Sequence, residues 1–329
     1  MDKLNKTVFT TIAALCICAT IILVNAGTPQ KEEPVISVTE TAQQAFSAVL
    51  APEVPHSVTF AGNEIALTVQ DRHERMDREM LAFCYSHINT MLQIKRANRL
   101  FPIVEPILQE CGIPDDFKYL MIIESNGDIV ARSPAGAGGL WQFMEATGKE
   151  YGLEVNTEID ERYNIEKATR AACRYLKDSY NEFGDWLTVA ASYNTGRANV
   201  SKRIDAQKQQ KAIDLVLLPE TSRYIFRLLA VKTIFARPAD YGFMLHSSDL
   251  YPQIATTEVE VKSNVASWAD FAQQYGLTYL QLREANPWIR GNGLTNRQNK
   301  TYKVQIPNVQ DLHYDPAMTK AHDSNWVID

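Results

Sequence analysis

Apolar residues recur at the spacing of an α-helix through most of the central part of this 329-residue chain. The pattern starts near Asp71, where Met76, Met80 and Phe83 lie three or four residues apart with charged residues between them. Such a period places apolar side chains on one face of a helix. No run in this region has the alternation of a sheet core, so residues 66–245 are predicted to form one mainly α-helical domain. Further helices are predicted at 103–110, 115–124, 139–151, 166–183, 185–193 and 220–235.

A second pattern begins after about residue 248. Val259 and Val261 alternate with polar residues, Trp268 and Phe271 share a helical face, and the alternation returns at residues 302–306. These periods predict a small α+β module of order strand, helix, helix, strand over residues 257–308. A polar tail, residues 309–329, follows it.

The N-terminus has the layout of an export signal. Two lysines precede an apolar run over residues 8–24, and Val24-Asn25-Ala26 offers small residues at the spacing that a signal peptidase requires. Residues 1–26 are therefore predicted to be a signal peptide or an uncleaved anchor, and the chain to lie in the periplasm or cell envelope. Residues 27–65 are rich in Pro, Glu, Thr and Ala and are predicted to be a linker, with a weak hairpin signal around Gly62-Asn63.

Composition excludes several functional classes. A formal charge of −6 leaves no basic stripe for nucleic-acid phosphates. The six histidines have no paired metal-ligand spacing, and no nucleophile elbow or phosphate loop is present, so we expect no metal and no cofactor. Cys84, Cys111 and Cys173 are odd in number without C-x-x-C spacing, which favours ordinary buried cysteines over one disulfide and a free thiol.

Glu124 is the main candidate for chemistry. Pro114 introduces the predicted helix, which Asp115 or Asp116 can cap, and the helix ends on Glu124 after an apolar run. The negative end of the helix dipole and apolar neighbours both disfavour the carboxylate and raise its pKa. An acid of this kind can donate a proton near neutral pH. On position alone, a solvated glutamate at a helix end is the commoner interpretation.

A glycine-rich turn follows, with Gly136, Gly138 and Gly139 in four residues. Glycines allow a backbone and a ligand to approach closely. Ser133 and Gln142 add neutral groups that can hydrogen-bond sugar hydroxyls.

Aromatic residues accompany this turn. Trp141 and Phe143 have the flat faces that stack on sugars, although core packing is their commoner role. Tyr193 and Asn194 end another apolar helix; singly they are most often a core aromatic and a cap. Together with a protonatable acid, these groups indicate a glycan site.

The sequence resembles the family 1 lytic transglycosylases of the goose-lysozyme-like superfamily. The resemblance rests on E-S at Glu124, on S-P-A-G-A-G-G-L-W-Q-F-M from Ser133, on T-G-K-E-Y-G-L from Thr147, on N-I from Asn164 and on A-S-Y-N from Ala191. It implies a lysozyme-like (goose-type, SLT) helical catalytic domain. The C-terminal module resembles a LysM peptidoglycan-binding domain, although residues 263–265 (Ser-Asn-Val) replace the usual Gly-Asp-Thr.

The resemblance implies cleavage of the MurNAc-β-1,4-GlcNAc bond of peptidoglycan without water, with 1,6-anhydroMurNAc as the new end. Glu124 would act first as acid and then as base, and Tyr193 would orient it. The remaining substrate-binding residues that it implies are Ser133, Gln142, Phe143, Met144 and Asn194. The expected partner is the glycan strand, bound by a monomer.

One carboxylate suffices for this chemistry, so Asp128, Glu145 and Asp185 are expected to be dispensable. Two positions depart from the family, which usually has proline at Ile129 and Glu145, and the extra carboxylate of Glu145 could shift the Glu124 pKa. A goose-type lysozyme-like hydrolase and a non-catalytic murein-binding scaffold remain alternatives. Removal of the residues after about Ser248 is expected to leave an active domain that binds murein more weakly.

Overall fold

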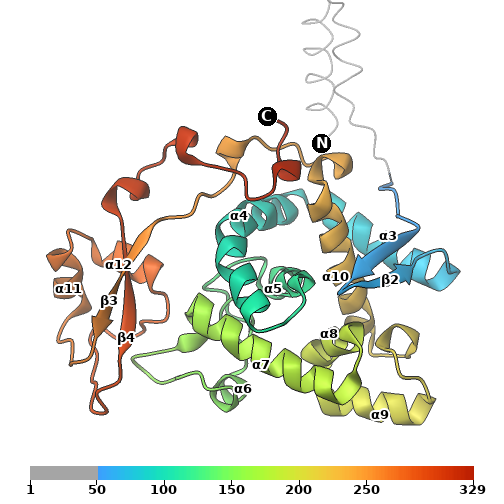
Figure 1. Ribbon diagram of the computed structural model, residues 1–329, viewed down its shortest axis with the longest axis horizontal. Helices are drawn as coiled ribbons and strands as arrows, with labels where there is room; N and C mark the ends of the chain where they lie inside the picture. Colours follow the sequence, from blue (N-terminus) through green and yellow to red (C-terminus); the bar gives the residue numbers. More distant parts are fainter. Residues whose placement is uncertain (1–50) are drawn as a thin grey trace, which may run out of the picture. The chain divides into compact units, whose positions relative to one another are not determined.

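The computed structural model describes residues 51–329, and helices dominate this part of the chain (Figure 1). The helices are α3 (Gln70–Tyr85), α4 (His87–Glu110), α5 (Lys118–Ser125), α6 (Glu145–Glu150), α7 (Ile165–Phe183), α8 (Trp186–Thr195), α9 (Arg197–Gln207), α10 (Pro219–Ala236), α11 (Trp268–Gln274) and α12 (Tyr279–Ala285). The strands are β1 (Ser57–Phe60), β2 (Asn63–Ala66), β3 (Thr256–Val261) and β4 (Tyr302–Pro307). The predicted mainly helical region and the small α+β module are therefore both confirmed.

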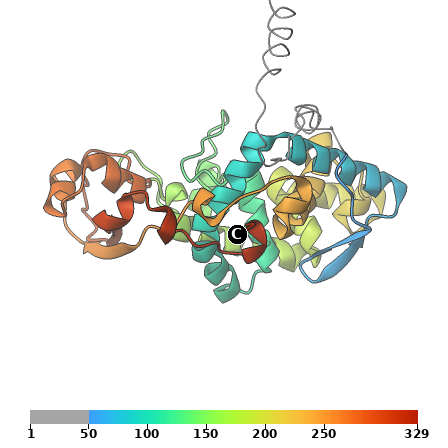
Figure 2. The ribbon, with the colours of Figure 1, turned by 90° about the horizontal axis from the view of Figure 1, so that it is seen from above.

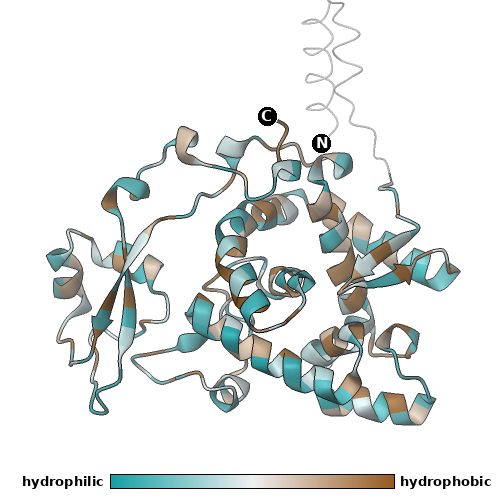
Figure 3. Ribbon diagram, viewed as in Figure 1, coloured by the Kyte–Doolittle hydropathy of each residue, from teal (hydrophilic) through white to brown (hydrophobic). Residues whose placement is uncertain are grey.

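Helix α10 is at the centre of the helical region and contacts α3, α5 and α8. Apolar positions recur along it (Figure 3), and most of its side chains are buried. Pro219 stands in its first turn, where the missing N–H costs nothing. The main core also takes in α4, α7 and the β1–β2 hairpin, through Phe60 and Phe101 among others. Residues 57–66, at the end of the predicted linker, thus share a core with the helices.

Local capping explains where α7 and α8 begin and end. The Asn164 side chain accepts a hydrogen bond from the Lys167 N–H at the start of α7, and Gly184 ends that helix with a φ of 65°. Asp185 accepts from the Thr188 N–H and caps α8. Gly184 thus ends α7 and Asp185 begins α8, as these residue types commonly do at helix ends.

Other predicted boundaries were wrong. The helix predicted at 103–110 is only the last part of α4, which continues through Pro102 and Pro106 because its buried face packs along the core. The helix predicted at 139–151 is reduced to α6, since residues 139–144 form a turn. Helix α9 was not predicted because its sequence is polar and only Val200 is buried.

The predicted cap of the helix that carries Glu124 was also wrong. Residues 115–117 form a 3₁₀ turn with no side-chain cap. Asp116 instead accepts a hydrogen bond from the Ala61 N–H and pairs with Lys232, while Asp115 pairs with Lys118. Both carboxylates are used by tertiary contacts, which the local pattern does not reveal.

The C-terminal module has its own core. β3 and β4 pair antiparallel from Thr256 opposite Pro307 to Val261 opposite Tyr302. Trp268 and Leu282 are fully buried between the sheet and the two helices. Seen from above, the module forms a separate lobe (Figure 2). The loop over residues 263–265 pairs with the loop after Leu294, where Asn264 accepts a hydrogen bond from the Asn296 N–H.

A segment of the helical region, residues 154–163, contacts this module. Ile159 forms a β-bridge with Ile289, and the Asp160 N–H donates to the Trp288 carbonyl. Ile159 and Tyr163 are buried within the module's hydrophobic cluster rather than the main core. We call residues 154–163 the connecting segment, because the two cores meet along it.

The C-terminal tail returns to the helical region. Trp326 is 3% exposed, packs edge-on against Phe101 and Phe235, and donates a hydrogen bond from its indole N–H to the Phe235 carbonyl. The His322 N–H donates to the Asn98 side chain. The segment predicted as a polar tail therefore fills part of the main core.

The predicted signal or anchor, residues 1–26, and most of the predicted linker lie outside the described residues. Within residues 51–329, no helix is long and apolar enough to cross a membrane. The three cysteines of this part are free thiols; Cys84 and Cys173 are buried and Cys111 is partly exposed.

Candidate active site

Glu124 lies in the last turn of α5, as predicted. The helix ends because Asn126 adopts a left-handed conformation, with a φ of 55°, and its N–H bonds the Ile122 carbonyl. Gln93 and Arg96 of α4 donate hydrogen bonds to the side chain and carbonyl of Asn126. The end of α5 is thereby fixed to α4, and so is the backbone that carries Glu124.

Tyr224 of α10 holds the Glu124 carboxyl. Its hydroxyl donates to Glu124 Oε1 at 2.5 Å. Burial raises the pKa of Glu124 from 4.5 to about 7, against the opposing effects of the Tyr224 hydrogen bond and of Arg227, and the charge of Glu220 adds to the rise. The direction agrees with the prediction, and loss of hydration is its main cause. The acidic residue whose charge acts on Glu124 is Glu220, since Glu145 pairs with Lys149.

The hydroxyl that bonds Glu124 in this structure is that of Tyr224, whereas Tyr193 was expected to orient the acid. The Tyr193 hydroxyl donates to the Trp141 carbonyl at 2.7 Å and not to Glu124. Trp141 is fully buried, with its indole N–H bonded to Thr169, so its role is core packing. Tyr193 supports the turn after Trp141 instead of orienting the acid. Tyr224 was missed because it lies 100 residues from Glu124 in the chain.

Two of the three glycines of the turn lie in close contact with other parts of the protein. A Cβ on Gly139, whose φ is +75°, would lie 1.8 Å from the Arg162 carbonyl oxygen. A Cβ on Gly138 would lie 2.9 Å from the Tyr163 hydroxyl. Both positions require glycine because the connecting segment crosses directly over them. Only Gly136 has open space where its Cβ would be.

Arg162, in the connecting segment, stabilises this turn by hydrogen bonds. Its guanidinium donates to the carbonyls of Gly136 and Phe143 at 2.9 and 3.1 Å. Asp160 accepts two further hydrogen bonds from the same guanidinium, and both side chains are largely buried. A buried, paired arginine with rigid donors fixes the turn at both ends. Sequence analysis did not identify Arg162, because no motif marks it.

The predicted substrate-binding residues lie on this turn and on α8. Ser133 accepts a hydrogen bond from the Ala137 N–H, and Gln142 donates to the carbonyls of Ala131 and Gly139. These two side chains therefore shape the turn. Gln142 adopts a φ of 48°, in the left-handed region that is uncommon for residues other than glycine. The hydrogen bonds from its side chain to the Ala131 and Gly139 carbonyls hold it in this conformation.

The remaining predicted residues differ in exposure. Phe143 is buried and packs edge-on against Tyr193, whereas Met144 is 45% exposed. Asn194 accepts a hydrogen bond from the Thr221 hydroxyl of α10. The structure thus joins Phe143 to Tyr193, and Asn194 to the start of the helix that carries Tyr224.

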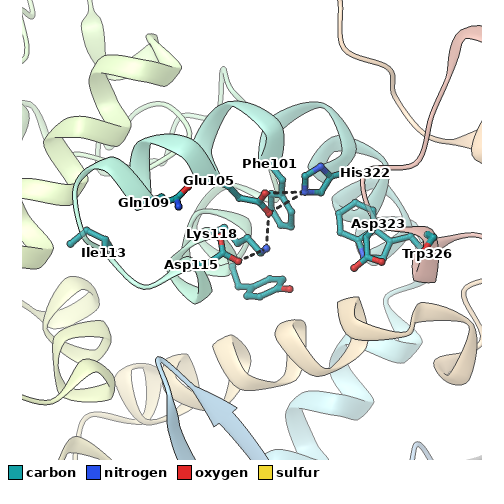
Figure 4. A pocket seen from close by; sticks show the side chains of 11 residues that line it. Phe101, Glu105, Gln109, Ile113, Asp115, Lys118, His322, Asp323 and Trp326 are labelled. Atoms are coloured by element: carbon teal, nitrogen blue, oxygen red, sulfur yellow. Dashed lines mark hydrogen bonds and ion pairs between the residues drawn. The ribbon is translucent and has the colours of Figure 1, made fainter.

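One large cavity lies away from Glu124. It encloses about 680 Å³ between α4, the start of α5 and the C-terminal tail. Figure 4 shows Glu105 between His322 and Lys118, which also pairs with Asp115. Glu124 is at the opposite end of α5, so this charged cluster secures the tail rather than the acid. Across residues 51–329, no group of three or more His, Cys, Asp or Glu could hold a metal ion.

We expect Tyr224→Phe to raise the Glu124 pKa further above 7, because the lost hydrogen bond stabilises the charged carboxylate. Hydrogen bonds to charged groups contribute about 1.5–3 kcal/mol. Loss of positioning should also lower the rate about tenfold at acidic pH. The pH–rate profile of glycan cleavage, the activity that the sequence resemblance implies, measures both effects. Tyr193→Phe is the matched control, and the pH above which its rate falls should equal that of the wild type. If the rate of Tyr224→Phe also falls at the wild-type pH, Tyr224 does not lower the pKa of Glu124.

Comparison with known proteins agrees with this geometry. The chain matches the model of the transglycosylase SLT domain over residues 109–216, which contain Glu124 and the glycine turn but not Tyr224. It matches the soluble lytic transglycosylase C-terminal LysM-like domain over residues 257–310.

Curated relatives match a longer part of the chain. It is 28% identical over 243 residues to the membrane-bound lytic murein transglycosylase D of Escherichia coli K12, covering 71% of this chain and 52% of the relative, and the protein of strain O6:H1 gives the same values. A putative tributyltin chloride resistance protein of Alteromonas sp. strain M-1 is 27% identical over 135 residues, covering 41% of this chain and 65% of that protein. The chain spans about half the length of the two transglycosylases. Residues 109–216 are therefore similar to transglycosylase SLT domains, and residues 257–310 to the LysM-like domain found at the C-terminus of soluble lytic transglycosylases.

Proposed function

We propose that this protein is a peptidoglycan lytic transglycosylase that cleaves the MurNAc-β-1,4-GlcNAc bond and leaves 1,6-anhydroMurNAc ends. The observation that carries the proposal is the environment of Glu124. This carboxyl is desolvated, is held by Tyr224, and has a pKa of about 7. Such an acid keeps its proton near neutral pH and can also accept one back.

The chemistry needs only this one carboxyl. The Glu124 proton passes to the glycosidic oxygen as the C1–O bond breaks, which leaves an oxocarbenium-like sugar. The C6 hydroxyl then attacks C1, and its proton returns to Glu124. Atoms and charge balance without water, and the enzyme is restored. Glycosidases that use water normally need a second carboxylate to activate the water or attack the sugar.

The other acids near the turn are engaged elsewhere. Asp128 accepts a hydrogen bond from the Val130 N–H, Glu145 pairs with Lys149, and Asp185 caps α8. Glu220 is different, because its charge acts on Glu124 and its side chain is exposed at the start of α10. If the protein were instead a goose-type hydrolase, Glu220 would be the candidate second carboxylate.

Product analysis of Glu220→Gln distinguishes the two reactions. We expect this variant to retain most of its activity, and both it and the wild type to release ends that lack a reducing group and are one water lighter than hydrolysis products. Mass spectrometry of fragments from purified sacculi measures this directly. Asp128→Asn serves as a control for loss of a nearby charge. Reducing ends from the wild type, together with an inactive Glu220→Gln, would establish the hydrolase.

We further propose an envelope location, with glycan strands as the partner of a monomer. The support is the export pattern of residues 1–26 and the similarity to transglycosylases named as membrane-bound. The domain boundaries proposed from sequence, 66–245 and 257–308, enclose the catalytic side chains and the LysM-like module respectively.

A further inference from the structure

A second cavity opens beside the candidate active site. It encloses about 390 Å³ between α9 and the chain that leads into α10. Thr195 and Thr221 line one end of it, and Thr221 donates the hydrogen bond to Asn194. Tyr224, which holds Glu124, follows Thr221 by about one turn of the same helix. A strand lying at Glu124 and Asn194 would therefore have this cavity within reach of its substituents.

The cavity is lined by cations and apolar groups. Lys202 and Arg203 of α9 contribute the charges, Leu217 and Leu218 contribute apolar surface, and no described residue that lines it is acidic. Across residues 51–329, neither Lys202 nor Arg203 forms an ion pair. Their charges are thus available to a ligand.

The local charge contrasts with that of the whole chain. The protein carries a formal charge of −6, yet α9 and the residues just after it have a single acid, Asp205. The basic residues of this stretch are Arg197, Lys202, Arg203, Lys208 and Lys211. A sugar backbone is uncharged and gives no reason for such a patch. An anionic group attached to the sugar does, because complementary charge favours encounter and orientation.

We infer that this cavity binds the peptide stem of a murein strand whose sugars lie at Glu124, with Lys202 and Arg203 on the free carboxylates of the stem. The exposed Leu218 would contact its alanine methyl groups. This inference rests on the proposed function. Under this inference, α9 determines the selectivity of the enzyme for strands with acidic stems over strands without them.

The test compares two substrates that differ only in stem charge: solubilised murein strands with native stems, and the same strands after their carboxylates have been converted to amides. We expect Lys202→Gln/Arg203→Gln to lower kcat/KM about fivefold on native strands, mainly through KM, and to match the wild type on amidated strands. The wild-type preference for native strands should shrink as salt is raised, because the paired groups are exposed.

The matched control is Lys208→Gln/Lys211→Gln, which removes the same charge from the same segment outside the cavity and should retain the preference. Equal rates for the wild type on both substrates, or an equal loss by the α9 variant on both, would overturn the inference while leaving the transglycosylase proposal intact. Failure of the wild type to cleave either strand would instead overturn the proposed function. Thermal melting of each variant confirms that these exposed substitutions leave the fold unchanged.

Discussion

Glu124→Gln is expected to abolish murein cleavage. Glutamine is nearly isosteric, and its carbonyl oxygen can still accept the Tyr224 hydrogen bond, but it cannot give or take a proton. Loss of general acid–base catalysis alone typically lowers rates by about 10²–10⁴-fold, and here one group serves both steps. Release of anhydro-muropeptides from sacculi measures the loss. Asp128→Asn, whose carboxylate bonds a neighbouring backbone N–H, is the control. Near-normal digestion by Glu124→Gln would exclude Glu124 as the acid.

The same substitution should stabilise the folded protein above neutral pH. Because the Glu124 pKa rises from 4.5 to about 7 on folding, the folded state binds more protons than the unfolded state between these values. The free energy of unfolding therefore falls as pH rises from 4.5 to 7, by about 3 kcal/mol in all, and glutamine avoids this cost. We expect equal melting temperatures for variant and wild type near pH 4, and a variant several degrees more stable at pH 8. Equal melting at both pH values would show that Glu124 is not desolvated as described.

Wild-type activity should fall above pH 7, since the protonated acid becomes scarce. The two measurements are linked, because the desolvation that keeps a proton on Glu124 also destabilises the fold. Stability is commonly lost at catalytic groups for this reason.

The parts of the fold that follow from local pattern were predictable. Glu124 at a helix end, the cap at Asp185 and the strand–helix–helix–strand order of the module all depend on neighbouring residues in the chain. The contacts that complete the site are not local. Tyr224 reaches Glu124 from another helix, and Arg162 reaches the glycine turn from the connecting segment. No periodicity in one segment reveals which residue of another segment will meet it.

The glycine turn shows the same limit. The three glycines predict that another group lies close to the backbone of the turn, but they do not identify that group. The structure places the Arg162 backbone against Gly139, a neighbour that the sequence did not reveal. The tail was interpreted as polar because no periodicity marks Trp326 as a core residue, and its burial comes from packing against Phe101 and Phe235.

These non-local contacts argue against one expectation drawn from composition, that removal of the residues after Ser248 leaves an active domain that binds murein more weakly. We expect a protein truncated there to lose its cooperative fold and its activity. Truncation removes Trp326 from the main core, and loss of a buried tryptophan side chain costs about 3–5 kcal/mol. It also removes the module's hydrophobic cluster, in which Ile159 and Tyr163 are buried. Domains of this kind are stable by about 5–15 kcal/mol in total, so the combined loss is comparable with the whole.

Two substitutions in the full-length chain separate the contributions. Trp326→Ala should lower the melting temperature by about 6–20 °C, through the loss of core packing and of the indole hydrogen bond to the Phe235 carbonyl. Met318→Ala, at a tail position that is 67% exposed, should not change it. If the truncated protein melts cooperatively at the wild-type temperature and digests murein at the wild-type rate, the module and tail are independent of the catalytic domain. If the truncated protein is unfolded while Trp326→Ala only has a lower melting temperature, the rest of the lost stability must come from contacts between the connecting segment and the module. Arg162 would then transmit the loss to the glycine turn, because its partner Asp160 is fixed by the backbone of Trp288.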